Sequence, residues 1–400
     1  MNILILTSKL PYPPRDGGAI ATLNMATGLA DSGHKVRLLA MNTTKHFFDP
    51  GQIPEQLRKK ITIITVDIKT HIRWPLLLWN LLFSKRPYNA VRFHSRQFTA
   101  KLKVLMNEEN PDIIQLEGPY LDYCIPLIRA MSKAKISFRA HNLEYEIWER
   151  RARQTKNPVI RGYLKILSSR IRKVEQSLAG KVDMIVPISG RDRNGFLKLG
   201  LSCPSIVCPA GLDIGAYPDP APIHEIRLFY IGALDWVPNT EGLDWFFQNV
   251  WNRLTVLHPE IDLHIAGRNP EYYFNSKKEL SGVIIEGEVD DAHAFINNYS
   301  VMIVPLLSGS GIRVKILEGM LLGRTVITTA TGAEGLDVTD NRNILIANTA
   351  DEFVAHIEKL IRSPELARSI GSAARQFVKQ NFDNLVISKK LADFYTLQQK

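Results

Sequence analysis

Two series of short apolar segments alternate with helix-length segments along the chain, and this repetition limits the fold more than any other feature. In the first series, apolar runs at 2–6 and 35–41 flank a helical stretch at 19–32 that stops at Gly33. Further strands are predicted at 61–66, 112–118, 136–140 and 184–189. This alternation predicts a parallel sheet covered by helices on both faces.

The alternation is interrupted once, at residues 208–224, which contain four prolines and two glycines. It then restarts, with strands predicted at 226–234, 262–267, 282–287, 301–306, 325–329 and 343–347. A chain of 400 residues also exceeds what one hydrophobic core usually fills. The sequence therefore predicts two α/β domains, 1–207 and 226–383, joined by a linker at 208–225. A helical tail at 384–400 follows a break at Asn381.

Composition and charge narrow the partners. Apolar residues make up 45% and charged residues 22%, as in ordinary globular proteins, but the net charge is +10 and favours anionic partners. Basic residues are concentrated between 150 and 173, where Tyr163 is the only interleaved aromatic. Nucleic-acid sites that bind single strands need several such aromatics, so we expect no nucleic acid as partner.

Three features bear on location. The three cysteines form no metal-binding or disulfide pattern, which fits a reducing cytosol. The first residues form a strand and lack the pattern of a secretory signal. The segment "IRWPLLLWNLLF" at 72–83 is too interrupted to span a bilayer. With the basic stretch after it, this segment is either a helix at a membrane interface or an ordinary buried helix.

Loops that follow the strands carry the candidate site residues, because ligands of open parallel sheets bind at the carboxyl ends of strands. Gly17 and Gly18 open the first helix, where backbone amides can approach an anion, although a plain turn would also account for them. In "SGSGIRVKILEGM", Arg313 and Lys315 stand in the first turn of a helix, where the dipole disfavours cations unless an anion binds. Glu318 follows and could accept hydrogen bonds from a diol, or form a surface pair with Lys315.

Two further loops are of interest. His141 directly follows a strand in "SFRAHNLEYE", Asn142 resembles a helix N-cap, and Glu144 then falls in the first turn. In "YIGALDWVPNTEGL", Gly232 and Asn239 follow another strand, and Asn239 is either a site residue or only a helix cap.

Taken together, these stretches resemble the retaining glycosyltransferases of the GT-B fold, family 4, over essentially the whole chain. The most specific segment is "VPLLSGSGIRVKILEGMLLGRTVITTATGAEGL" together with "DWVPN" at 235–239. Both are similar to sugar transferases of bacterial exopolysaccharide and surface-glycan assembly. The resemblance implies two Rossmann-like domains whose parallel sheets face across a cleft, with the helix at 384–400 packing back on the N-terminal domain.

The resemblance also implies roles for individual residues. His141 would contact the transferred sugar, Glu318 would bind the ribose, and Arg313 and Lys315 would stabilise the departing diphosphate. The implied donor-binding residues are Gly17, Gly18, Gly232, Gly287, Val289, Ser310, Gly311, Ile312 and Glu318. The implied acceptor-side residues are Arg15, Glu117, Asn142 and Glu144. Family members commonly carry a glutamate where this chain has Ser310, so we expect Arg313 and Lys315 to supply the charge there.

The expected activity is retaining, metal-independent transfer of a hexosyl group from a nucleoside-diphosphate sugar, UDP before GDP, to a glycan or lipid-linked acceptor. No metal and no cofactor beyond this donor are expected, since the chain lacks an Asp-x-Asp triplet in a suitable loop. The expected location is the cytoplasm, with peripheral contact at the inner face of the cytoplasmic membrane left open. The alternatives are a nucleotide-sugar epimerase of the same fold and a non-catalytic protein that binds membranes or glycans.

Overall fold

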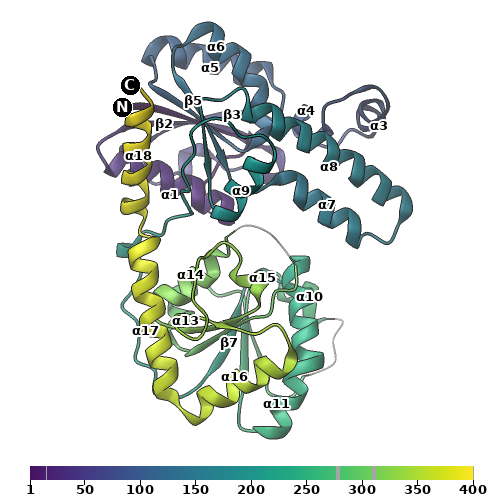
Figure 1. Ribbon diagram of the computed structural model, residues 1–400, viewed down its shortest axis with the longest axis vertical. Coiled ribbons are helices and arrows are strands. Elements are labelled where there is room, and N and C mark those ends of the chain that lie inside the picture. The colour runs from purple at the N-terminus through teal and green to yellow at the C-terminus, as the bar shows by residue number, and fades with distance from the viewer. Residues whose placement is uncertain (15, 276–279, 309–311, 400) are drawn as a thin grey trace. The chain divides into compact units, whose positions relative to one another are not determined.

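The computed structural model describes residues 1–14, 16–275, 280–308 and 312–399. It forms two units, one of Met1–Leu212 with Asn384–Lys400 and the other of Asp213–Asp383 (Figure 1). Each unit contains a six-stranded sheet, and all strand pairings found among the described residues are parallel. The predicted α/β architecture is therefore confirmed for both halves.

The sheet of the first unit has the strand order β3-β2-β1-β4-β5-β6. Its strands are β1 (Asn2–Thr7), β2 (Lys35–Thr43), β3 (Thr62–Ile68), β4 (Ile113–Glu117), β5 (Lys135–Ala140) and β6 (Met184–Pro187). The central strands are buried on both faces, which explains their nearly continuous apolar runs. The order reverses between β1 and β4, where Thr7 pairs with Glu117.

Helices cover both faces of this first sheet. One face packs against α1 (Gly17–Asp31) and α18 (Asn384–Gln399) around Ile5, Leu29 and Tyr395. The other face packs against α5 (Arg96–Glu109), α6 (Ile125–Met131) and α9 (Gly190–Lys198). The short helices α2 (Glu55–Lys60) and α4 (Tyr88–Val91) complete the unit.

Three helices project from this core (Figure 1). Helices α7 (Glu144–Gln154) and α8 (Pro158–Ala179) pack on each other around Ala152, Leu164 and Ile171. Helix α3 (Trp74–Phe83) lies at the edge, and Asn80 is its only buried residue. The prediction of an ordinary buried helix at 72–83 is therefore wrong, since the apolar side chains of α3 face outward.

The second unit repeats the topology with the order β12-β11-β10-β7-β8-β9. Its strands are β7 (Leu228–Ile231), β8 (Leu263–Ala266), β9 (Val283–Gly287), β10 (Val301–Val304), β11 (Thr325–Thr328) and β12 (Leu345–Ile346). Its helices are α10 (Val237–Phe246), α11 (Asn252–Leu257), α12 (Pro270–Phe274), α13 (Ala292–Asn297), α14 (Val314–Leu321), α15 (Ala330–Ala333), α16 (Ala350–Arg362) and α17 (Pro364–Asn381). A π-helical segment, Phe247–Trp251, joins α10 to α11. In chain order, both sheets read 3-2-1-4-5-6, the order of dinucleotide-binding folds.

The chain leaves the second unit after α17 and ends in the first as α18. Helix α17 ends at Asn381, where the break was predicted. Helix α18 packs along α1, and the two helices approach so closely that a Cβ atom on Gly28 would lie 2.1 Å from Ser388 Oγ. The predicted return of the terminal helix to the N-terminal domain is confirmed.

Candidate active site

Polar side chains meet at the carboxyl edge of each sheet, at the point where the strand order reverses. In the first unit this point lies between β1 and β4, and in the second it lies between β7 and β10. Two diverging connections leave a crevice at such a point, where ligands of this fold class bind. Both clusters of predicted site residues lie there.

Glu117 is the centre of the first cluster. Its carboxylate ends β4 and is almost inaccessible to solvent, with 2% of the side chain exposed. It accepts hydrogen bonds from His141 Nε2 at 2.5 Å, Thr22 Oγ1 at 3.2 Å and Arg139 Nη1 at 3.4 Å. Gln115 Nε2 also donates to it. A buried carboxylate is stable only with such partners.

These partners keep Glu117 ionised. Burial alone would raise the pKa of Glu117, but the charge of Arg139 and the hydrogen bonds from His141 and Gln115 outweigh burial and lower the pKa to about 2. An ionised carboxylate can only accept hydrogen bonds, so Nε2 of His141 must carry the proton that is shared with Glu117. The pair resembles the carboxylate–histidine arrangement that fixes an imidazole ring in one tautomer.

The segment that follows His141 forms the start of α7 and is held in place by a residue of α8. Glu175 of α8 accepts hydrogen bonds from the backbone N–H groups of Glu144 at 2.8 Å and Tyr145 at 3.1 Å. Leu143 is therefore the N-cap residue, and the prediction that Asn142 caps this helix is wrong, because Glu175 satisfies the first amides instead. Glu144 lies in the first turn as predicted, accepts a hydrogen bond from Tyr120, and has its pKa raised by burial.

The glycine loop lies beside this cluster at the start of α1. Gly17 is the first helical residue, and Asp16 caps the helix by accepting from the backbone N–H of Ala19 at 3.0 Å. Neither Gly17 nor Gly18 has a positive φ, so the backbone conformation does not require glycine at these positions. What the two glycines contribute is the absence of a side chain beside the amides of the helix terminus. Arg15, predicted on the acceptor side, lies outside the described residues.

Lys315 is the centre of the second cluster. Its ammonium group lies 3.2 Å from both Tyr230 Oη and Asn239 Oδ1 and 4.4 Å from the centre of the Tyr230 ring. Among the described residues, no carboxylate lies within ion-pair distance of it. Burial and the nearby Arg313 lower the pKa of Lys315 to about 7. A cation held only by neutral groups is suited to an anionic ligand.

Gly232 leaves the space that this arrangement needs. A Cβ atom at Gly232 would lie 2.8 Å from Tyr230 Oη and 2.9 Å from Lys315 Nζ. Asn239 donates from Nδ2 to the carbonyl of Ala233 at 2.8 Å, while Trp236 is the N-cap of α10. Asn239 therefore belongs to the Lys315 site, and the prediction that it is only a helix cap is wrong.

Glu318 lies on the same helix as Lys315 but has different partners. It accepts a hydrogen bond from the Tyr217 hydroxyl at 3.1 Å, and His293 Nε2 lies 3.9 Å from its Oε1. The Tyr217 and His293 rings lie 4.2 Å apart, and the Glu318 carboxylate raises the pKa of His293. The alternative of a surface pair between Lys315 and Glu318 is therefore wrong. With 23% of its side chain exposed, Glu318 remains accessible.

The other predicted donor residues are distributed along the same edge. Arg313 is the N-cap residue of α14, and Ile312 before it is half-buried. Gly287 ends β9 with a positive φ of 78°, and Val289 follows it. Ser310 and Gly311 lie outside the described residues. No group of three or more His, Cys, Asp or Glu side chains in the described part of the chain is arranged to hold a metal ion.

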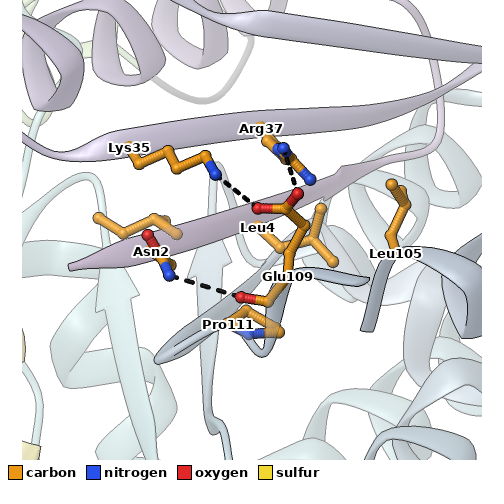
Figure 2. Close-up of a pocket in the computed structure, with 8 residues that line it drawn as sticks. Asn2, Leu4, Lys35, Arg37, Leu105, Glu109 and Pro111 are labelled. Carbon is orange, nitrogen blue, oxygen red and sulfur yellow. Dashed lines mark hydrogen bonds and ion pairs between the residues drawn. The ribbon is translucent and has the colours of Figure 1, made fainter. Parts of the chain in front are cut away.

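Two hollows in the structure lie at the opposite, amino edges of the sheets. Figure 2 shows the first, of about 10 Å³, where Glu109 pairs with Lys35 and Arg37. The second, of about 460 Å³, is lined by residues just before β7 and β8, including Arg227 and Asp262. Neither contains a predicted site residue. Substrate sites of this fold class lie at the other edge.

Several residues of the two clusters were not predicted as site residues. Gln115, Arg139 and Tyr395 belong to the first cluster, and Tyr217, Tyr230 and His293 belong to the second. A signal existed for two of them, because Gln115 and Arg139 are polar residues inside apolar strands, two positions before Glu117 and His141. The others come from distant segments, and no local pattern marks them.

Comparisons with known proteins agree with this geometry. Two protein families match the chain. The family described as "Glycosyltransferase Family 4" matches residues 15–215, and the family described as "Glycosyl transferases group 1" matches residues 225–363. A protein of the cps region of Klebsiella pneumoniae, described as uncharacterized, is 23% identical over 96% of this chain and 97% of its own length.

Solved structures give the fold. HepE of Anabaena, determined in complex with UDP, has a TM-score of 0.69 at 14% identity and covers 99% of this chain and 100% of its own. Sucrose-phosphate synthase of Thermosynechococcus elongatus has a TM-score of 0.70 at 15% identity and covers 99% of both chains. The two parallel sheets, the returning terminal helix and these matches show the GT-B fold. The chain whose first unit carries Glu117 and His141, and whose second carries Lys315 and Glu318, is a glycosyltransferase and belongs to Glycosyltransferase Family 4.

Proposed function

We propose that this protein is a retaining, metal-independent transferase that moves a hexosyl group from a UDP-sugar to a glycan or lipid-linked acceptor of bacterial surface polysaccharide. The observation that carries the proposal is Lys315, a cation whose partners among the described residues are neutral, on the same helix as the accessible carboxylate of Glu318. A nucleoside diphosphate has complementary groups, since its phosphates are anionic and its ribose is a diol. HepE, which shares the fold, was determined with UDP and with UDP-glucose.

The chemical task explains the cation. Breaking the bond between the anomeric carbon and the diphosphate leaves negative charge on the departing diphosphate, which is the main charge to be stabilised. Lys315, Arg313 and the positive end of α14 are our candidates for this role. Since Lys315 forms no ion pair with the described residues, none of their carboxylates competes with the leaving group for its ammonium. This is why we propose that no metal ion is required.

We assign to His141 the contact with the transferred sugar that the family resemblance implies. Because Nε2 donates to Glu117, Nδ1 is the ring nitrogen that is left to contact a sugar hydroxyl. The residues near Gly287 and Val289 are assigned to the base. Gly17 and Gly18 are assigned to the diphosphate, through the amides at the start of α1.

The donor is tested by thermal shift with UDP, GDP and ADP in the presence of EDTA. A nucleotide at 100 times its Kd should add about 2.7 kcal/mol of stability. Stabilisation by UDP alone supports the proposed donor. The product of a successful transfer is then analysed by NMR, and an inverted anomeric carbon would contradict the retaining mechanism. Loss of activity in EDTA and recovery with Mg²⁺ would contradict metal independence.

The acceptor side favours a membrane-bound substrate. On α3, Trp74, Leu82 and Phe83 are each at least 70% exposed. The helix is held in this orientation by Arg170, which donates to the carbonyl oxygens of Asn80 at 3.0 Å and Leu81 at 2.7 Å. The only polar residue of the helix is thus turned inward and its apolar residues outward. Exposed apolar patches of this kind mark interaction surfaces.

The charge of the residues around α3 indicates what kind of surface the helix contacts. Residues 68–107 contain no Asp or Glu. Their basic residues are Lys69, Arg73, Lys85, Arg86, Arg92, Arg96, Lys101 and Lys103. Aromatic and aliphatic side chains beside lysine and arginine are suited to the interface of an anionic bilayer. None of the described helices is both long and apolar enough to cross a bilayer.

The membrane contact is tested by co-sedimentation with vesicles. We expect binding to vesicles that contain anionic phospholipid, weaker binding to neutral vesicles, and loss of binding in the variant Trp79→Glu/Leu82→Glu. The matched control is Val256→Glu/Leu257→Glu, which changes two exposed apolar residues at the end of α11. Equal binding by both variants, or no binding by the wild type at low salt, would contradict the proposal.

A further inference from the structure

A continuous chain of buried hydrogen bonds connects the terminal helix to His141. The Tyr395 hydroxyl of α18 donates to Gln115 Oε1 at 2.5 Å, Gln115 Nε2 donates to Glu117, and Glu117 accepts from His141 Nε2 at 2.5 Å. Tyr395 and Gln115 are completely buried. All the residues that form these hydrogen bonds lie within the first unit, where α18 packs beside α1 (Figure 1).

The direction of each bond follows from its neighbours. Glu117 is ionised and can only accept, so the Gln115 amide must turn its NH₂ group toward it. The amide oxygen then points to Tyr395, whose hydroxyl has the one proton that this oxygen needs. Burial raises the pKa of Tyr395 well above its usual value, which keeps the hydroxyl protonated. The tyrosine thus stabilises the orientation of the Gln115 amide that Glu117 requires.

The strand register explains why Tyr395 can reach this amide. Gln115 and Glu117 lie on the same face of β4, because side chains alternate along a strand. Their neighbours on β5 are Ser137 and Arg139. Arg139 donates to Glu117, and the Tyr395 hydroxyl lies 2.9 Å from that of Ser137. A polar strip therefore crosses this face of the sheet under α1 and α18.

We propose that Tyr395 is a positioning residue for His141 and acts through Gln115 and Glu117. It holds the Gln115 amide so that Glu117 keeps its place and the His141 ring keeps Nε2 turned toward Glu117. The terminal helix is then part of the sugar-binding apparatus of the first unit, in addition to closing its core. The inference rests on the proposed role of His141, but the geometry of the ring can be tested separately.

The test compares Tyr395→Phe with Ser388→Ala, which deletes another buried hydroxyl of α18 outside the chain. We expect Tyr395→Phe to lower kcat about three- to tenfold, with the affinity for UDP unchanged, because the residues assigned to UDP lie outside this series of hydrogen bonds. Ser388→Ala should keep kcat within about twofold of the wild type. Far-UV circular dichroism of both variants checks that they fold.

A second readout does not need activity. Long-range ¹H–¹⁵N spectra report which imidazole nitrogen of His141 carries the proton, and we expect one tautomer, protonated at Nε2, in the wild type and in Ser388→Ala. Tyr395→Phe should give a mixture of tautomers, and Gln115→Met, which breaks the chain at the next residue, should give the same mixture. An unchanged His141 spectrum in both variants would overturn the proposal. If the wild type transfers no sugar but the spectra change as expected, the proposed reaction is wrong and the positioning role stands.

Discussion

The two polar clusters lie at equivalent points of two sheets with the same topology, yet they balance charge in opposite ways. In the first unit, Glu117 is surrounded by groups of the protein itself, which donate to it and include the cation Arg139. In the second, the contacts of Lys315 with described residues are to neutral oxygen atoms and an aromatic ring. The first cluster is complete without a ligand, whereas we propose that an anion completes the second. On this proposal, the same edge of the fold provides a positioning group in one unit and a binding group in the other.

The largest expected effect tests whether the charges of Glu117 and Arg139 neutralise each other inside the first unit. Glu117→Ala leaves Arg139 buried without its carboxylate, so we expect the free energy of unfolding to fall by about 3–5 kcal/mol. Urea denaturation measures this loss. Glu318→Ala should change stability by less than about 1 kcal/mol, because Glu318 is partly exposed. Equal losses in the two variants would remove the distinction between the clusters.

Acid titration should reveal the same carboxylate. The pKa of Glu117 falls from 4.5 to about 2 on folding, so its contribution is present above pH 4.5 and is lost as the pH falls from there toward 2. The full contribution corresponds to about 3 kcal/mol. Stability measured across this range should decline less steeply in Glu117→Gln than in the wild type. Parallel curves would show that Glu117 is not held ionised by its neighbours.

Removal of the accessible carboxylate should act on the donor alone. We expect Glu318→Ala to weaken UDP binding by about 10- to 150-fold, equivalent to roughly 1.5–3 kcal/mol for the charged hydrogen bonds to the ribose. Isothermal titration calorimetry measures the affinity. His141→Ala is the matched control, since it should lower kcat while UDP binding stays within about twofold. An unchanged affinity in Glu318→Ala would exclude the ribose role.

The last prediction concerns the charge of Lys315, and its effect near neutral pH is the smallest. Its pKa of about 7 in the free protein means that the ammonium loses its proton above neutral pH, while a bound diphosphate favours the charged form. The phosphate of the nucleotide is already ionised above about pH 7.5, so affinity for UDP should fall there with rising pH, by at most about tenfold per unit. Lys315→Met should bind weakly and without this dependence. A wild-type affinity that stays constant between about pH 7.5 and 9.5 would contradict the assignment.

The alternation of strands and helices predicted both sheets and the break at Asn381, because periodic apolar patterns depend on local spacing alone. The positions of His141, Lys315 and Glu318 after their strands were also readable, since ligand loops follow the carboxyl ends of parallel strands. The sequence failed where a distant segment supplied the decisive group. Glu175 of α8 caps the helix that Asn142 was predicted to cap, and Arg170 of the same helix turns α3 outward.

By itself, then, the sequence determined the two α/β halves, the family and the loops that carry the site, because each depends on residues close together in the chain. Only the tertiary structure decided which groups neutralise one another. Tyr395 reaches Gln115 across 280 residues, and Tyr217 reaches Glu318 across 101. Hydrogen bonds and charges act through space over a few ångströms, so their partners are set by packing and leave no periodic trace along the chain.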